Sequence, residues 1–302
     1  MTCPLIIARL AGGLGNQLFI YAAAAALAQA RQARLMLDTT LSFKHDGYRR
    51  QYSLDAFQGP AACPKLPSVF CGVIGRTLRR LLMSLPSRFP GLPYYKEAQT
   101  GTFDSTLATR PLPARLYLEG YWQSEAYFAQ AAPQVREHVK PVRAASPESA
   151  KLAASLNPET AVSLHIRRQI GLPPNTQGVA GPGNYLLSPD YYHESIRLMS
   201  SSIPHPQFVV FGDNPAWARN TLKLPVDRTL WIPEGRDDVE DLLLMAQCRH
   251  HIIANSSFSW WGAWLGETTS SHILAPGAGW VNRDSIPSRW HVVPIQAGTN
   301  QP

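Results

Sequence analysis

The sequence predicts an α/β fold of two domains that face a cleft. Its length of 302 residues is typical of about two domains. The chain opens with a strand, a glycine-rich turn, a helix and a second strand, and from residue 160 onward strand-like and helix-like segments alternate. Such alternation implies parallel strands joined by right-handed crossovers. The stretch 141–158, which contains Pro, Ala and Ser, is the predicted linker, so we expect domains of residues 1–145 and 146–302.

The first domain is predicted from the start of the chain. The apolar run 5–10 is a strand, and the glycines within 12–16 end it. The alanine-rich segment 17–30 has high helix propensity, and 34–38 is the second strand. Residues 41–115 contain many Pro and Gly and show no strong period, so we expect them to be irregular.

The second domain is predicted as a doubly wound sheet, because helix-like segments lie between its strand-like runs. The predicted strands are 161–166, 208–211, 251–254 and 272–275, and the predicted helices lie near 191–200, 238–248 and 258–265.

The composition indicates a folded protein with anionic partners. A hydrophobic content of 45% and a charged content of 16% exclude disorder over most of the chain. Lys and Arg number 28 against 21 Asp and Glu, and the net charge of +7 favours anionic ligands such as nucleotides. No basic stripe is interleaved with aromatic residues, so we expect no nucleic-acid partner. The 4 cysteines have no paired spacing, which favours reduced thiols over a disulfide or a zinc site.

We expect a cytoplasmic protein. No apolar run reaches the roughly 18 residues needed to cross a bilayer, and the N-terminus lacks the basic segment of a secretory signal. Residues 76–83 mix arginine with leucine. They can form a solvated helix over the core, or they can contact the inner membrane surface.

The glycine-rich turn at 12–17 is the first candidate binding segment. Glycines between a strand and a helix let backbone N–H groups approach a phosphate, and the helix N-terminus adds a favourable dipole. Asp38, at the end of the next strand, matches the ribose-binding acid of a dinucleotide fold. However, Leu18 stands where the third glycine of that fingerprint belongs. The same glycines are also what a tight turn with positive φ requires.

A histidine and two arginines mark the second candidate, His165-Ile166-Arg167-Arg168, at the end of a predicted strand. Ligands of open α/β sheets bind at the carboxyl ends of the strands, and arginines offer forked donors that match phosphate oxygens. Neighbouring side chains on a strand point to opposite sides, so we expect one arginine to face a ligand and the other the fold. Ordinary surface arginines are the alternative.

Two further segments combine polar residues with helix starts. Within 255–262, small polar residues can cap a helix and donate to phosphate. The adjacent Trp260 and Trp261 are predicted to pack in the core rather than to form a sugar platform. The acidic residues of 236–241 can ligate a metal, but carboxylates are favoured at helix starts by capping and by the macrodipole, and we expect no metal site.

Five segments of the chain, taken together and in this order, resemble those of the α1,2-fucosyltransferases of glycosyltransferase family eleven. The matching segments are GGLGNQLF at 12–19 with Tyr21 and Ala22, GYWQSEAYF at 120–128, His165–Arg168, Phe211–Asn214 and Asn255–Trp261. The resemblance implies a GT-B-like fold of two Rossmann-like domains. In that fold the N-terminal domain receives the acceptor and the C-terminal domain binds GDP-fucose. It also implies inversion at the anomeric carbon without a metal or another cofactor. Animal members carry an N-terminal membrane anchor, which we do not expect here, so the resemblance is to bacterial members.

The resemblance also implies roles for individual residues. In related enzymes the first arginine of the His-x-Arg-Arg segment contacts the β-phosphate of the donor, which implies a catalytic role for Arg167. His165 and Asp213 are implied to bind guanine. The other residues of the predicted donor site are Gly15, Asn16, Gln17, Arg168, Asn255, Ser256 and Ser257.

One position departs from the family pattern and leaves the general base open. The family continues Arg-Arg-Gly-Asp, whereas this chain has Ile170 in place of the aspartate. The candidate bases are Asp38, Glu125 and Asp190. A dissociative mechanism, in which the departing phosphate takes the proton, needs no side-chain base.

The function predicted from these residues is transfer of L-fucose from GDP-fucose to a galactoside hydroxyl of a surface glycan precursor, in α1,2 linkage. Three alternatives stay open. Ile170 allows a different donor such as GDP-colitose, or a nucleotide-sugar-binding protein without turnover. The glycine turn and Asp38 allow a nicotinamide-dependent oxidoreductase.

Overall fold

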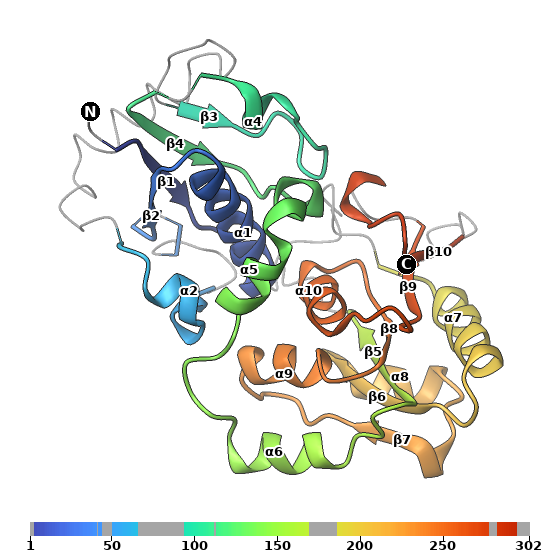
Figure 1. The fold of residues 1–302 in the computed structure, drawn as a ribbon. Coiled ribbons are helices and arrows are strands. Elements are labelled where there is room, and N and C mark those ends of the chain that lie inside the picture. The colour runs from blue at the N-terminus through green and yellow to red at the C-terminus, as the bar shows by residue number, and fades with distance from the viewer. Residues whose placement is uncertain are drawn as a thin grey trace, which may run out of the picture. The chain divides into compact units, whose positions relative to one another are not determined.

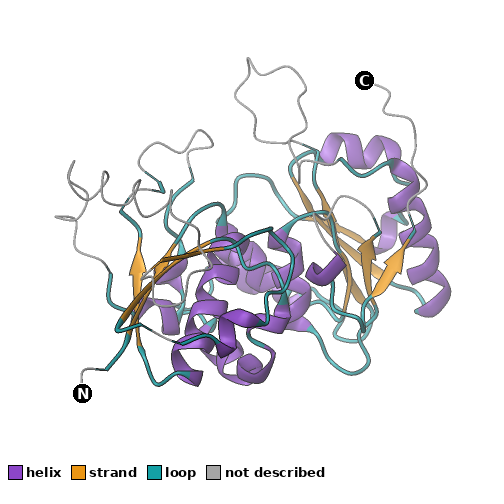
Figure 2. Ribbon diagram, turned by 90° about the horizontal axis from the view of Figure 1, so that it is seen from above, coloured by secondary structure: helices purple, strands orange, loops and turns teal. Residues whose placement is uncertain are grey.

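The chain folds into two compact units, each built on one parallel sheet. The computed structural model describes residues 3–40, 42–43, 50–65, 94–111, 113–168, 186–277 and 283–294 (Figure 1). The first unit comprises Met1–Arg143 with Asn282–Ser285, and the second comprises Ala144–Val281 with Ile286–Pro302. In each unit helices lie beside the sheet (Figure 2), and every pair of neighbouring strands in the described ranges is parallel. The predicted α/β class is confirmed.

The sheet of the first unit has the strand order β2-β1-β4-β3, so the strand that opens the chain is an interior strand. Its strands are β1 (Leu5–Arg9), β2 (Arg34–Asp38), β3 (Tyr94–Lys96) and β4 (Arg115–Glu119). Its helices are α1 (Leu14–Ala30), α2 (Gln58–Ala61), α4 (Thr106–Thr109) and α5 (Ala132–His138), with 3₁₀ turns η1 (Leu54–Ala56), η3 (Glu125–Tyr127), η4 (Ala129–Ala131) and η6 (Arg283–Ser285).

Helix α1 forms because alanine has the highest helix propensity and most of its length is apolar. It begins at Leu14, earlier than predicted, because Gly13 serves as its N-cap residue. It ends at Ala30, shortly before Gln32, whose φ of 49° cannot continue a right-handed helix. Leu18 is fully buried, as is Phe19, which packs against Phe128 with ring centroids 6.3 Å apart. The helix is therefore part of the core of the first unit.

The prediction that 41–115 is irregular was wrong where the range holds α2, β3, α4 and the start of β4. Residues 94–96 form β3, and β4 begins at Arg115. A strand of three residues is too short to show a period of two, and β3 exists because β4 offers it a parallel partner. The basic segment 76–83 lies outside the described residues.

The second unit has a six-stranded sheet with the order β10-β9-β8-β5-β6-β7, the strand order of a Rossmann sheet. Its strands are β5 (Ala161–Ile166), β6 (Gln207–Gly212), β7 (Thr229–Trp231), β8 (His250–Ile252), β9 (Ile273–Pro276) and β10 (His291–Val293). Its helices are α6 (Pro147–Ala154), α7 (Pro189–Ser202), α8 (Pro215–Thr221), α9 (Asp238–Met245) and α10 (Ser257–Gly266), with the 3₁₀ turn η5 (Val226–Arg228). All four strands and all three helices predicted here are present.

Both faces of this sheet are covered by helices. Along β5, Val162 and Leu164 point to one face and pack with residues of α7 and α8, including Tyr192. Ala161 points to the other face and packs with residues of α9, including Leu244. This alternation follows from the period of two in a strand. It explains why β5 is apolar along nearly its whole length, as central parallel strands are.

Four tryptophans form an aromatic cluster in the second unit. Trp260, Trp261 and Trp264 project from α10, and Trp290 packs on Trp260 with centroids 5.4 Å apart. The three indoles of α10 have pairwise centroid distances of 5.2 to 6.1 Å, and each is at most 1% exposed. The prediction that Trp260 and Trp261 belong to the core is confirmed.

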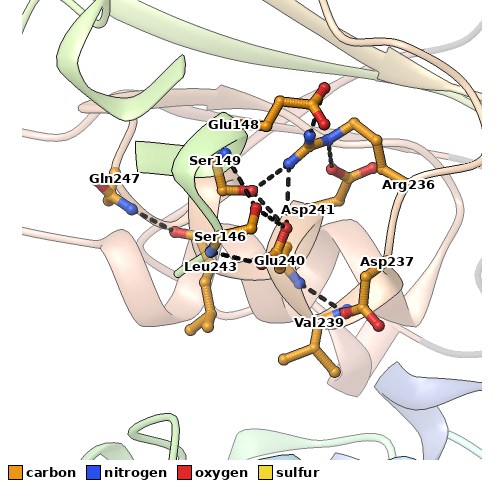
Figure 3. A network of polar contacts seen from close by, with 10 residues as sticks. All are labelled: Ser146, Glu148, Ser149, Arg236, Asp237, Val239, Glu240, Asp241, Leu243 and Gln247. Carbon is orange, nitrogen blue, oxygen red and sulfur yellow. Dashed lines mark hydrogen bonds and ion pairs between the residues drawn. The ribbon is translucent and has the colours of Figure 1, made fainter. Parts of the chain in front are cut away.

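The acidic segment 236–241 joins two helices of the second unit (Figure 3). Asp237 caps α9 by accepting the N–H groups of Val239 and Glu240 at 2.8 and 3.1 Å. The Arg236 side chain, 6% exposed, pairs with Asp241 at 2.8 Å and with Glu148 of α6 at 3.0 Å. Capping, one of the two readings of this segment, is confirmed.

The carboxylate of Glu240 adds hydroxyl contacts to the same network (Figure 3). It accepts from the hydroxyls of Ser146 at 2.7 Å and Ser149 at 2.6 Å, next to the guanidinium of Arg236. Ser146 caps α6, so one network holds the start of α6 against the start of α9.

We expect Arg236→Ala to lower the free energy of unfolding by about 2 kcal/mol, because it removes charge-assisted hydrogen bonds from a nearly enclosed guanidinium. Urea unfolding checks this. The matched control is Arg197→Ala, which removes an exposed pair with Glu194 on α7 and should leave the midpoint unchanged. Equal effects of the two substitutions would show that the network does not hold α6 to α9.

Candidate functional site

The point where the second sheet reverses direction gathers three of the segments selected from the sequence. β6 joins β5 on one side, whereas β8 joins it on the other. In open α/β sheets, ligands bind outside the carboxyl ends of the strands at such a reversal. The residues that follow β5, β6 and β8 include Arg167, Asp213 and Ser256 respectively.

Arg167 and Ser256 are in contact although they lie 89 positions apart. Nη1 of Arg167 donates to Oγ of Ser256 at 3.3 Å. Ser256 is the N-cap residue of α10, and its Oγ also accepts the N–H of Phe258 at 3.3 Å. Ser257, the first residue of the helix, is partly exposed. A guanidinium and the start of a ten-residue helix thus lie together, and both favour an anionic group such as a diphosphate.

Arg168 has its contacts within the fold. Its guanidinium lies 4.2 Å from the ring centroid of Trp217 and donates to the carbonyl of Leu187 at 2.9 Å. Its backbone N–H donates to Oδ1 of Asp213 at 2.7 Å. The structure therefore gives Arg168 a positioning role, and its direct contact with a ligand stays a prediction.

Gly212 lets β5 and β6 end side by side. Its φ is 153°, and an added Cβ would lie 2.3 Å from the carbonyl oxygen of Ile166. Only glycine fits this approach without moving the backbone. Asp213 follows directly, and its N–H and Oδ1 both bond to the end of β5, at Ile166 and Arg168. The Asp213 carboxylate is thus held by two strand ends.

His165 and Asn255 bring polar groups to the same edge. Nδ1 of His165 and Nδ2 of Asn255 are buried and have no hydrogen-bond partner in the described part of the chain. Burial, together with the positive charge of Arg167, lowers the pKa of His165 to about 3. The imidazole is therefore neutral near pH 7. It can donate or accept one hydrogen bond at a ligand, but it is not a source of positive charge.

In the first unit, the corresponding reversal lies between β1 and β4. Gly12 has a φ of 78°, so the turn after β1 needs a glycine, as predicted for a tight turn. Oδ1 of Asn16 accepts from Nε2 of Gln123 at 2.8 Å, across 107 positions. This bond joins the glycine-rich turn to the GYWQSEAYF segment. Gly15 lies buried in the first turn of α1.

Gln17 is fully buried and holds the glycine-rich turn in place. Its Nε2 donates to the carbonyls of Gly12 at 3.0 Å and Gln51 at 2.8 Å, and its Oε1 accepts the N–H of Ser53 at 3.1 Å. All hydrogen-bonding groups of this amide therefore have partners within the fold. A contact between Gln17 and a donor stays a prediction.

Glu97 is a residue that sequence reasoning missed, and it supports the GYWQSEAYF segment of the first unit. Its carboxylate accepts the N–H groups of Tyr121 at 2.6 Å and Trp122 at 3.0 Å, and it fixes the turn that leads to Gln123. Burial raises the pKa of Glu97 above its ordinary value. The aromatic residues that precede it, Tyr94 and Tyr95, are the signal of a strand that could have directed attention to this position.

The three candidate bases lie in different settings. The Asp38 carboxylate is 1% exposed and accepts from Thr40 and from the hydroxyl of Tyr117, so the structure encloses it in the first unit. Glu125 begins η3 and is partly exposed, and Asp190 is exposed in the first turn of α7. A catalytic role for any of them stays a prediction. Ile170 lies outside the described residues.

Three further features concern the described ranges: metal ligands, membrane-spanning helices and cysteines. No group of three or more His, Cys, Asp or Glu side chains there could hold a metal ion. Within those ranges, the helices are too short or too polar to traverse a bilayer. Cys3, Cys63 and Cys248 are free thiols.

Sequence comparisons identify relatives over nearly the whole chain. Residues 95–280 match the model of Glycosyl transferase family 11. The α-1,2-colitosyltransferase of Escherichia coli is 30% identical over 301 residues, which cover 95% of this chain and 98% of that protein. Galactoside α-(1,2)-fucosyltransferase 1 of Sus scrofa is 28% identical over 113 residues, which cover 36% of this chain and 29% of that protein.

A structural comparison supports the same architecture. The structure of Arabidopsis thaliana FUT1 in complex with GDP aligns with a TM-score of 0.51 and 11% identity, over 94% of this chain and 73% of that chain. The likeness concerns the fold, and the two parallel sheets found here agree with the predicted pair of Rossmann-like units.

We expect the free energy of unfolding to fall as the pH drops from 8 to 5. Burial lowers the pKa of both His165 and His251 to about 3 in the folded protein, whereas an unfolded histidine titrates near 6.5. Below pH 6.5 the unfolded chain therefore binds more protons, and each histidine removes on the order of 2 kcal/mol by pH 5. Urea unfolding at several pH values measures this.

A variant at one of these positions tests the cause of the pH dependence. His251→Gln should flatten the curve, whereas the same change at the exposed His193 should leave it intact. A stability that does not change between pH 8 and 5 would mean that the buried histidines accept protons in the folded protein.

Proposed function

The chain belongs to Glycosyl transferase family 11, and we propose that this glycosyltransferase moves L-fucose from GDP-fucose to a galactoside in α1,2 linkage. The acceptor we propose is a hydroxyl of a surface glycan precursor. The names of the colitosyltransferase and the fucosyltransferase relatives both specify an α-1,2 linkage, which supports the linkage proposed here. The matched segments from Gly12 to Trp261 support the choice of a GDP-linked deoxy sugar.

The observation that carries this proposal is the contact between Arg167 and Ser256 at the start of α10. Transfer breaks the bond between the anomeric carbon and an oxygen of the β-phosphate. Negative charge then develops on the diphosphate while the sugar becomes cation-like. A guanidinium and helical N–H groups aimed at that charge stabilise the transition state more than the ground state.

A neutral imidazole and a carboxylate are proposed to recognise the base of the nucleotide. His165 lies at the end of β5 with an unpartnered Nδ1, and its pKa of about 3, caused by burial, keeps the ring uncharged. Asp213 offers a carboxylate fixed by the backbone of Arg168. A carboxylate can accept two N–H groups from guanine, as it does from arginine.

The acceptor hydroxyl must lose a proton as it attacks from the face opposite the diphosphate, which inverts the anomeric carbon. We propose that Glu125 takes this proton, or that the departing phosphate takes it through a bridging water molecule, since Asp38 is enclosed. We also propose that transfer needs no metal, because Arg167 supplies the positive charge. Activity that persists in excess EDTA is the expected result.

A second donor, GDP-colitose, is favoured by one specific observation. The colitosyltransferase of Escherichia coli is similar to this chain over 95% of its length. Colitose lacks the hydroxyl that fucose carries at carbon 3. A site built to bond that hydroxyl rejects the deoxy sugar by roughly 10⁴-fold or more. A site built for the deoxy sugar rejects the extra hydroxyl by only about 100-fold.

The primary test is release of GDP from GDP-fucose and from GDP-colitose, with and without a panel of β-galactosides. We expect acceptor-dependent release, and the ratio of kcat/KM between the two donors distinguishes them. A preference for fucose above about 10⁴ assigns fucose. A preference for colitose assigns colitose. GDP binding without release from either donor would contradict the proposed transfer and leave a nucleotide-binding protein.

We expect Arg167→Lys to lower kcat by about 100-fold or more while the protein still binds GDP, because lysine lacks the forked geometry of the guanidinium. Steady-state kinetics with isothermal titration of GDP measures both quantities. Arg197→Lys, an exposed change in the same unit, is the control and should keep full activity. Near-normal turnover of Arg167→Lys would remove Arg167 from the catalytic role.

A further inference from the structure

The first unit contains a cavity that none of the predicted donor residues line. Its volume is about 550 Å³, within the range of small-molecule sites. Its wall combines four aromatic rings with two carboxylates, those of Tyr95, Phe103, Trp122, Tyr127, Glu97 and Asp104. All of these residues belong to the first unit.

The aromatic rings form a continuous wall. Tyr95 stacks on Trp122 with centroids 6.0 Å apart, and Trp122 meets the edge of Tyr127 at 5.5 Å. Phe103 meets Tyr127 at 4.9 Å and is 37% exposed. Tyr95 and Trp122 are almost fully buried. Tyr95 and Trp122 therefore form the rigid back of the wall, and the rings that a ligand can contact are those of Phe103 and the partly exposed Tyr127.

The polar groups of the cavity are held in defined positions. Oδ1 of Asp104 accepts from the N–H of Thr106 at 2.9 Å and from its hydroxyl at 2.6 Å, and its other oxygen accepts from the hydroxyl of Tyr95. The guanidinium of Arg110 lies 4.4 Å from the ring centroid of Tyr95. A few fixed donors and acceptors on an otherwise aromatic wall are typical of ligand sites.

Trp122 adds an independent observation. Its φ is 55°, a conformation that is rare for a large side chain and costs about 1–3 kcal/mol. Its Nε1 is buried and has no hydrogen-bond partner among the described residues. Glu97 holds the strained turn by accepting the N–H groups of Tyr121 and Trp122. Strain that a neighbouring group maintains in this way is characteristic of binding sites.

We propose that this cavity binds a galactoside unit of the acceptor, an inference that rests on the proposed function. In galactose the axial hydroxyl at carbon 4 leaves the hydrogens of carbons 3, 4 and 5 together on one face, which matches an aromatic wall. Its other hydroxyls match Asp104 and Arg110. The carboxylates of Glu97 and Asp104 disfavour a phosphate, so the cavity suits a neutral sugar and not the nucleotide donor.

The test measures binding of methyl β-galactoside and lactose to the full-length protein by saturation-transfer NMR and titration. Ala98 is exposed on the cavity wall, so Ala98→Trp fills the space without disturbing the core. We expect it to weaken galactoside binding at least tenfold. Phe103→Ala should weaken it about three- to tenfold, through loss of one aromatic contact. Val226→Trp, at a position 94% exposed in the second unit, is the control and should bind as the wild type does.

Far-UV circular dichroism and urea unfolding of the same proteins show that each variant is folded. Equal galactoside binding by the wild type and both cavity variants would overturn the proposal, as would a wild type that binds neither sugar at millimolar concentration. These results stand apart from catalysis. Galactoside binding that the cavity variants weaken, without release of GDP, would contradict only the proposed transfer. GDP release that the cavity variants leave unchanged would contradict only the galactoside site.

Discussion

The parallel pairing of β5 with β6 and β8 is the constraint on which the candidate site depends. β5 and β6 are in register to their last residues, Ile166 opposite Gly212, so the segments after them start at the same edge. β8 lies on the other side of β5 and directs the start of α10 to that edge. Hydrogen bonds then fix positions that the sheet has already brought close. Apolar side chains buried on both faces of the sheet determine how its strands pair. The strand pairing in turn places the polar residues of the site.

The elements predicted best are those whose sequence alone specifies them. Strands 34–38 and 161–166 were predicted to the residue, since their composition and the turns that bound them leave little choice. β3, β4, β7 and β10 were not predicted. β3, β7 and β10 have only three residues each, and all four depend on neighbouring strands for their hydrogen bonds. The start of α1 was placed too late because its first turn contains glycine and asparagine, which are poor helix formers.

The positions of the candidate site residues along the chain were predicted, but the residues that they contact were not. A strand end identified Arg167 and the family resemblance identified Asp213, but no pattern indicated that Arg168 would stack on Trp217 or that Asn16 would bond Gln123. Such pairs are distant in sequence, and their geometry arises only when the sheet has formed. Glu97 was missed for the same reason, since its role is to accept N–H groups from a turn that follows another strand.

The tryptophans are distributed unevenly between the two units. Seven of the eight lie in the second unit, because Met1–Arg143 contains only Trp122 and Asn282–Ser285 contains none. The indoles of Trp260 and Trp264 lie within 12° of parallel at 6.1 Å, close enough for their electronic transitions to couple. Exciton signals between these indoles in the circular dichroism spectrum therefore report on the second unit alone. The loss of structure in that half of the chain can therefore be followed without any label.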